Sequence, residues 1–134
     1  MFVSLGERMM KMPTDFVFVF GSNLAGRHGA GAAKYAVQYY DAKYGVGEGP
    51  TGRSYALPTK DENLNTRSYE EISVSIIHFL NYAKKNGNQI FVLTPVGCGL
   101  AGLEASKIAN LFKMHTAGKM PSNVVLHTSW LDHL

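Results

Sequence analysis

The sequence of 134 residues has little cysteine and no long hydrophobic run. Its one cysteine, Cys98, excludes an internal disulfide and is typical of proteins kept in a reducing compartment. No apolar segment is long enough to span a bilayer, and there is no secretory hydrophobic segment. Internal repeats and low-complexity tracts are absent as well. These absences predict a cytoplasmic protein without a membrane partner.

Charge of either sign is also scarce. The chain has 13 basic and 10 acidic residues, a net charge of +3, and its basic residues are scattered. This distribution does not favour direct nucleic-acid binding, although it leaves it open. The five histidines lack metal-ligand spacing, so we expect no metal site and no cofactor. The length predicts one domain over residues 1–134.

What the sequence does contain is an alternation of strand-like and helix-like segments. Continuous β-rich apolar runs predict buried strands, and apolar positions at helical spacing predict amphipathic helices. A capping box, Ser68 with Glu71, marks one helix start. The predicted strands are 2–5, 16–20, 54–58, 90–94 and 123–128, and the predicted helices 31–44, 69–86 and 105–115, with a loop at 47–52. This order predicts an α/β fold with a mixed, mostly parallel sheet and helices on both faces.

Two glycine-rich loops each follow a predicted strand and precede a predicted helix. The first covers residues 21–31 (GSNLAGRHGAG) and the second covers residues 95–102 (PVGCGLAG). Glycine lets backbone N–H groups approach a ligand closely, and a helix start adds partial positive charge. Ligands of such folds bind at the carboxyl ends of the strands, where both loops lie. Two such loops on one sheet suit a ligand with two phosphates, and therefore a nucleotide derivative.

The second loop also matches the dinucleotide-binding fingerprint, with Gly97, Gly99 and Gly102 at the required spacing. A Rossmann fold needs an acidic residue about 20 positions later to bind the ribose. Between Ala105 and Leu131 there is no aspartate or glutamate, and only one strand-like segment follows the loop. These features argue against a Rossmann dehydrogenase.

Three segments, in this order, resemble motifs of the macrodomain superfamily. In the first loop, Asn23 precedes a glycine run that includes Gly29 and Gly31. The sequence PTK (58–60) is followed by RSYEEI (67–72), and the second loop reads GCGLAGL (97–103). The resemblance covers residues 15–111 and is greatest to the branch with ADP-ribose glycohydrolases and antitoxins that remove ADP-ribose from DNA. It implies a three-layer α/β/α fold and, as partner, ADP-ribose or an ADP-ribosylated macromolecule.

The resemblance also implies which residues form the site. Asn23 and Lys60 take the catalytic positions: Asn23 orients the distal ribose, and Lys60 either stabilises phosphate charge or attacks the anomeric carbon. The implied ligand-binding residues are Gly21, Ser22, Asn23, Gly29, Gly31, Thr59, Gly97, Cys98, Gly99, Leu100, Ala101 and Gly102. From the residues alone, plainer interpretations stay open, with Asn23 as a turn residue, Lys60 as a solvated lysine and Cys98 as a small buried side chain.

Two departures from the family pattern bear on activity. Some glycohydrolases of this branch have an aspartate where this chain has Ala101, and many macrodomains have an acid where it has Ala32. We therefore expect binding of ADP-ribose or of ADP-ribosyl groups, with hydrolysis of an ADP-ribosyl linkage as a further step. The alternatives are a non-catalytic reader or scavenger of ADP-ribose or NAD metabolites, and a nucleic-acid-binding module.

Overall fold

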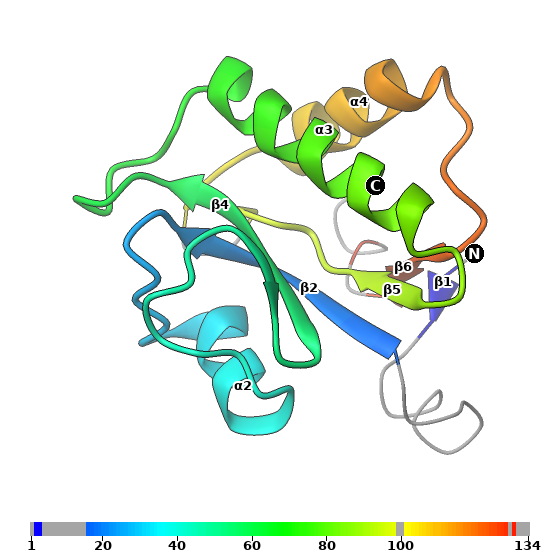
Figure 1. Ribbon diagram of the computed structural model, residues 1–134. Helices are drawn as coiled ribbons and strands as arrows, with labels where there is room; N and C mark the ends of the chain where they lie inside the picture. The colour runs from blue at the N-terminus through cyan, green and yellow to red at the C-terminus, as the bar shows by residue number, and fades with distance from the viewer. Residues whose placement is uncertain (1, 4–15, 99–100, 129, 131–134) are drawn as a thin grey trace.

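The computed structural model describes residues 2–3, 16–98, 101–128 and 130. Its centre is a six-stranded sheet with the order β1-β6-β5-β2-β4-β3 (Figure 1). Neighbouring strands run parallel except for β3 and β4. The strands are β1 (Phe2–Val3), β2 (Phe16–Asn23), β3 (Gly49–Thr51), β4 (Ser54–Lys60), β5 (Ile90–Leu93) and β6 (Val124–His127). The prediction of a mixed, mostly parallel sheet is confirmed.

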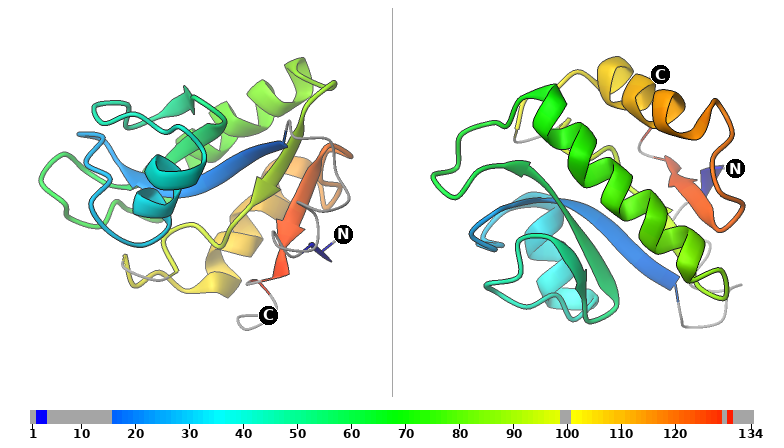
Figure 2. Two further views of the ribbon diagram at one scale, coloured as in Figure 1. Left: turned by 90° about the horizontal axis from the view of Figure 1, so that it is seen from below. Right: turned by 45° about the horizontal axis from the view of Figure 1, so that its top comes forward.

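Helices cover both faces of this sheet. The helix α2 (Gly31–Tyr39) lies on one face, and α3 (Tyr69–Lys85) and α4 (Ala105–Thr116) lie together on the other (Figures 1 and 2). This arrangement is the predicted three-layer α/β/α fold. Within the described ranges, none of the helices has the length and hydropathy needed to cross a membrane.

The strand β2 contributes to both hydrophobic cores. Phe18 and Phe20 pack with Ala36 of α2, whereas Val17 and Val19 belong to the larger core beneath α3 and α4. Successive side chains of a strand point to opposite faces, so an entirely apolar strand requires a cover on each side. The helix α2 covers one face of β2, and α3 and α4 cover the other. The strand lies inside the sheet, between β4 and β5.

The helix α3 begins at the predicted capping box. The Ser68 hydroxyl accepts a hydrogen bond from the Glu71 N–H at 3.1 Å, and the Glu71 carboxylate accepts one from the Ser68 N–H at 3.0 Å. Hydrogen bonding from Ser68, first of all from its backbone N–H, lowers the pKa of the Glu71 carboxyl. The apolar stripe of the helix, which includes Ile72, Ile76 and Phe79, is fully buried. The start of α3 thereby fixes where the loop from β4 must end.

Two strands extend further than predicted. The strand β2 continues to Asn23 instead of residue 20, and β4 continues to Lys60 instead of residue 58. Gly21 pairs with Leu57, and after a register shift Asn23 pairs with Lys60. Parallel pairing supplies the backbone hydrogen bonds of a glycine-containing segment that looks like a loop in isolation. As a result, Asn23 and Lys60 are neighbours on adjacent strands.

The first predicted helix is too long, and the predicted loop after it contains a strand. The helix α2 ends at Tyr39, not residue 44, because the Arg53 Nη2 donates to the Tyr39 carbonyl at 2.7 Å and Asp41 adopts a φ of +60°. Gly49–Thr51 then pairs with β4 as the antiparallel strand β3. Tertiary contacts override the local helical periodicity here.

Candidate functional site

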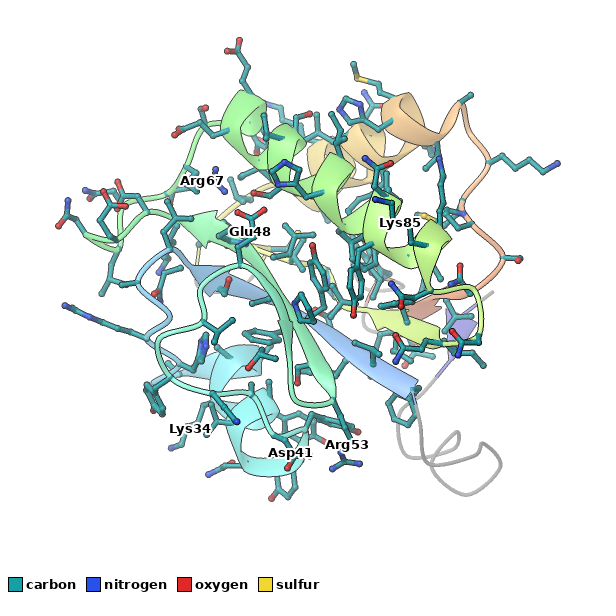
Figure 3. All side chains as sticks on the ribbon, viewed as in Figure 1. Lys34, Asp41, Glu48, Arg53, Arg67 and Lys85 are labelled. Atoms are coloured by element: carbon teal, nitrogen blue, oxygen red, sulfur yellow. The ribbon has the colours of Figure 1, made fainter. Side chains whose placement is uncertain are left out.

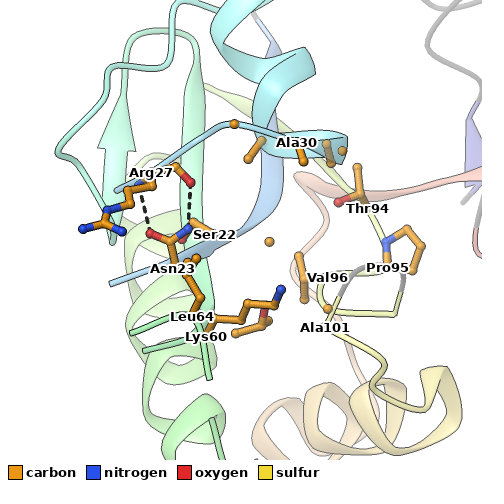
Figure 4. A pocket seen from close by; sticks show the side chains of 17 residues that line it. Ser22, Asn23, Arg27, Ala30, Lys60, Leu64, Thr94, Pro95, Val96 and Ala101 are labelled. Carbon is orange, nitrogen blue, oxygen red and sulfur yellow. Dashed lines mark hydrogen bonds between the residues drawn. The ribbon is translucent and has the colours of Figure 1, made fainter. Parts of the chain in front are cut away.

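A cleft of about 380 Å³ lies at the carboxyl ends of β2, β4 and β5 (Figure 4). The start of α2 forms one wall, and the loop after β5 forms another. Parallel strands end at the same edge of a sheet, so the loops that follow them come together. The structure thus places both glycine loops around one cavity.

Most of the predicted site residues line this cleft. They are Gly21, Ser22, Asn23, Gly29, Gly31, Thr59, Lys60, Gly97 and Ala101. Cys98 and Gly102 do not line it, and Gly99 and Leu100 lie outside the described residues. The individual roles of the lining residues stay predictions.

The start of α2 presents backbone donors to the cleft. Ala30, at the N-cap, makes no side-chain capping bond, and the first turn has no acidic residue. Residues 31–33 line the cleft, and N–H groups in the first turn of a helix have no partner within it. Of the charged residues described, Arg27 and Lys60 line the cleft, and no aspartate or glutamate does. This wall is suited to an anion.

Two glycines that line the cleft, Gly21 and Gly97, lie where the backbone of β2 and of the second loop come close. Gly97 has a φ of +78°, and a Cβ there would lie 2.4 Å from Leu103 Cδ1 and 3.0 Å from Thr59 Cγ2. A Cβ on Gly21 would lie 3.0 Å from the Gly97 nitrogen. Both positions therefore need glycine for close packing of β2 against the second loop.

The Asn23 side chain closes the loop between β2 and α2. Its Oδ1 accepts the Arg27 N–H at 2.8 Å, and its Nδ2 donates to the Arg27 carbonyl at 2.7 Å. These contacts are those of a turn residue. An amide group has two N–H donors and two oxygen lone pairs. One donor and one acceptor of Asn23 are thus left for a ligand.

The Lys60 side chain extends into the cleft next to Asn23, while the Arg27 guanidinium points away from it (Figure 4). The Lys60 carbonyl accepts the Leu24 N–H at 3.0 Å, which joins the ends of β4 and β2. In the described part of the chain, no carboxylate forms an ion pair with Lys60. Its ammonium group is available to an anionic ligand.

The Cys98 side chain is partly buried. Its Sγ lies 3.6 Å from the Val96 carbonyl oxygen, and the residue packs against the core beneath α3 and α4. Burial raises the pKa of the thiol to about 11, so the sulfur is protonated at neutral pH. Because the thiolate is the reactive form, this environment favours the interpretation of Cys98 as a small buried side chain.

The cleft also contains residues that the sequence analysis did not single out. Thr94 directly follows β5, and its hydroxyl donates to the Val19 carbonyl at 2.8 Å. Its position directly after a buried strand and directly before a glycine loop is a sequence signal that could have identified it as a cleft residue. Leu64 lines the cleft from the loop between β4 and α3. No motif or spacing around Leu64 indicates a ligand site.

Comparison with known proteins decides the fold. No family model matches the sequence. No curated protein matches it either. The structure, however, aligns with the macrodomain of Mycobacterium tuberculosis DarG with a TM-score of 0.66, at 15% identity, over 95% of this chain and 97% of that one. The chain has the macrodomain fold.

Two further solved structures have a similar fold. The macrodomain of Thermus aquaticus DarG gives a TM-score of 0.58 at 17% identity and covers 94% of this chain and 95% of its own. Thermosipho africanus DarTG in complex with ADP-ribose gives 0.58 at 17% identity, over 85% of this chain and 38% of that one. The predicted resemblance to macrodomains is confirmed in the fold, and the Rossmann alternative is rejected.

Proposed function

We propose that this chain binds ADP-ribose or an ADP-ribosyl group in the cleft. The observation that carries the proposal is that both glycine loops, the uncapped start of α2 and the Lys60 side chain meet at one cleft that no described acidic residue lines. Backbone donors arranged in this way suit a diphosphate. Thermosipho africanus DarTG, 38% of which aligns with this chain, has been solved in complex with ADP-ribose and supports this choice of ligand.

In the proposed complex the diphosphate lies between residues 29–31 and the second glycine loop. The distal ribose lies near Asn23 and Lys60, where the remaining donor and acceptor of the Asn23 amide meet its hydroxyl groups. When the distal ribose is attached to a macromolecule, that ADP-ribosylated macromolecule is the proposed partner. The Lys60 ammonium then stabilises negative charge on the ligand.

A charge placed in the cleft tests this proposal. Gly29 lines the cleft, has a φ outside the left-handed region and would meet no atom within 4 Å if it gained a Cβ. Gly29→Glu should weaken ADP-ribose binding in isothermal titration by at least about tenfold, because its carboxylate faces the diphosphate.

Gly87→Glu is the matched control, because Gly87 is equally unhindered and lies in the exposed turn beyond α3. It should bind ADP-ribose as the wild type does. Undiminished binding in Gly29→Glu, or no binding in the wild type, would rule out this site.

We further propose that the chain hydrolyses an ADP-ribosyl linkage and that Lys60 carries the step. Its side chain extends into the cleft beside Asn23 (Figure 4). The Lys60 Nζ first gives a proton to water, and its lone pair then forms a bond to the anomeric carbon while the bond to the departing group breaks. That group leaves with the electron pair and takes a proton from water. A water molecule then attacks the same carbon, releases the Nζ and completes ADP-ribose.

The Lys60→Ala variant distinguishes an enzyme from a reader. Wild-type protein should release ADP-ribose from a peptide or oligonucleotide to which it is linked through its anomeric carbon, and Lys60→Ala should not, while its ADP-ribose affinity falls by less than about tenfold. A reader, which the alanine at Ala101 favours, would show no turnover even in the wild type. The product is measured by chromatography of the released nucleotide.

A further inference from the structure

A fully buried histidine belongs to the first glycine loop. Arg27 and Gly29 line the cleft on either side of it in the sequence, whereas His28 does not line the cleft and is 0% exposed. Its ring packs edge-on against Phe20 of β2, with the ring centroids 5.2 Å apart. Buried polar groups almost always have hydrogen-bond partners. The hydrogen bonds of this ring therefore indicate what it does.

The chain that follows α2 binds this loop through three hydrogen bonds. The His28 Nε2 donates to the Val46 carbonyl at 3.1 Å, and the Tyr44 hydroxyl donates to the His28 carbonyl at 3.1 Å. The Gly45 N–H donates to the Gly26 carbonyl at 3.0 Å. These bonds join two stretches that are distant in the sequence. They hold the part of the loop that lies directly before its cleft-lining glycines.

In the described part of the chain, one of the two ring nitrogens of His28 has a partner. A carbonyl oxygen only accepts, so the Nε2 that meets Val46 carries the proton, and the Nδ1 carries the lone pair of a neutral imidazole. The Nδ1 is buried, and no described residue forms a hydrogen bond with it. Protonation would therefore place a charge and a second N–H where the new donor has no acceptor.

The groups around the ring do not favour its charged form. Charged and titratable side chains of its own loop and of the facing segment are Arg27, Lys43, Tyr44 and Glu48. The first two are exposed cations, and the Glu48 carboxylate pairs with His78 at 3.0 Å. Burial lowers the pKa of His28 and outweighs the Val46 and Lys43 carbonyls, which raise it.

We infer that His28 is a positioning residue of the phosphate site, whose neutral ring fixes the first glycine loop in the form that binds the ligand. This inference rests on the proposed ADP-ribose binding, in which the diphosphate lies against residues 29–31. The ring acts through the loop and not by contact with the ligand. Loss of its bond to the Val46 carbonyl, or protonation of the ring, releases the loop and weakens binding.

The sign of the pH effect follows from the lowered pKa. Because the pKa of His28 lies below its ordinary value of 6.5, the ring is neutral above that value, and ADP-ribose affinity should be constant there. Affinity should fall as the pH decreases below it. The diphosphate and the adenine of ADP-ribose do not titrate in this range, so the change in affinity comes from the protein.

Isothermal titration with ADP-ribose at about pH 7.5 and about pH 5 tests the inference. The wild type should bind about three- to tenfold more weakly at the lower pH. His28→Gln can still donate to the Val46 carbonyl and does not titrate, so it should bind within about threefold of the wild type at both pH values. His28→Phe keeps the ring packing but loses the donor, and should bind about tenfold more weakly than the wild type at the higher pH.

His115→Gln is the matched control. His115 is bonded to Ser73 at 2.7 Å between α4 and α3 and does not line the cleft. This variant should keep both the affinity and the pH dependence of the wild type. Urea unfolding at both pH values should show that each protein is folded where its affinity is measured. If His28→Phe does not fold, the wild type and His28→Gln still test the inference through their pH dependence.

Four results would overturn the role of His28 while ADP-ribose binding stands. These are equal wild-type affinity at both pH values, a loss at low pH in His28→Gln as large as in the wild type, undiminished affinity in folded His28→Phe, and a loss at low pH that occurs only because the wild type unfolds. Failure of the wild type to bind ADP-ribose at the higher pH would instead overturn the proposed function.

Discussion

Asn23 shows how one side chain serves both structure and ligand. Its amide binds the Arg27 backbone on both sides, at 2.8 and 2.7 Å. Asn23→Ala leaves that N–H and carbonyl without their partner and should cost about 1–2 kcal/mol of unfolding free energy. Because the loop leads into α2, ADP-ribose affinity should fall as well. Urea unfolding and isothermal titration measure the two effects.

Asn23→Asp separates the two effects. The carboxylate keeps an acceptor for the Arg27 N–H but places a negative charge against the Arg27 carbonyl oxygen and the diphosphate site. It should bind ADP-ribose more weakly than Asn23→Ala does. If Asn23→Ala has wild-type stability, the amide does not stabilise the loop, and Asn23 contributes to ligand binding alone.

Single residues also show what a sequence can and cannot predict. The cleft positions of Asn23 and Lys60 follow from motifs at strand ends, because strand ends meet at one edge of the sheet. The position of Leu64 does not follow from any motif, because its positive φ of +65° accompanies hydrogen bonds in which the Leu64 and Asn65 N–H groups donate to Asp61. For Cys98, the loop could be predicted from the sequence. The direction of its side chain could not, because it depends on packing.

Among the elements, the end of β4 depends on its link to α3. The Arg67 Nη1 donates to the Pro58 carbonyl at 2.8 Å and to the Ser75 Oγ at 2.9 Å, between strand and helix (Figure 3). Arg67→Met keeps the length of the side chain but leaves both acceptors unpaired. This should lower the free energy of unfolding by about 1–3 kcal/mol. ADP-ribose affinity should fall with it, because Lys60 follows at the same strand end. Urea unfolding and titration measure both.

Arg53→Met is the control for this prediction. The Arg53 ion pair with Asp41 is exposed at 2.8 Å (Figure 3), and exposed pairs contribute little. Arg53 does not line the cleft, and its bond to the Tyr39 carbonyl is at the other end of α2 from the cleft. Its ADP-ribose affinity should equal that of the wild type. A loss of stability without a loss of affinity in Arg67→Met would show that Arg67 supports the fold and does not position the site.

Element boundaries were predictable where local signals fix them. The capping box sets the start of α3, and its apolar stripe sets its buried face, so both could be predicted. The ends of β2 and β4 and the end of α2 could not, because they are fixed by partners distant in the sequence. Gly21 is in a strand because Leu57 pairs with it, and α2 stops where Arg53 binds its last carbonyl.

For the whole molecule, the alternation of strands and helices predicted the layers, but the strand order needed the structure. The apolar run of β2 indicates a central strand, and it does lie between β4 and β5. The same periodicity does not reveal that Gly49–Thr51 adds an antiparallel edge strand. It also does not show how unequal the two helical layers are. The helix α2 buries Ala33 and Ala36, whereas α3 buries larger residues such as Phe79 and Leu80.

This inequality predicts where a ligand changes the dynamics of the molecule. Alanines bury little apolar area, so α2 should open locally at a lower free energy than α3. A diphosphate at the start of α2 would bind its free N–H groups and stabilise this helix first. In hydrogen exchange of the free protein, the amides of α2 should exchange faster than those of α3. Saturating ADP-ribose should slow exchange in α2 at least about tenfold more than in α3, whereas equal slowing in both helices would show that the ligand does not act through the start of α2.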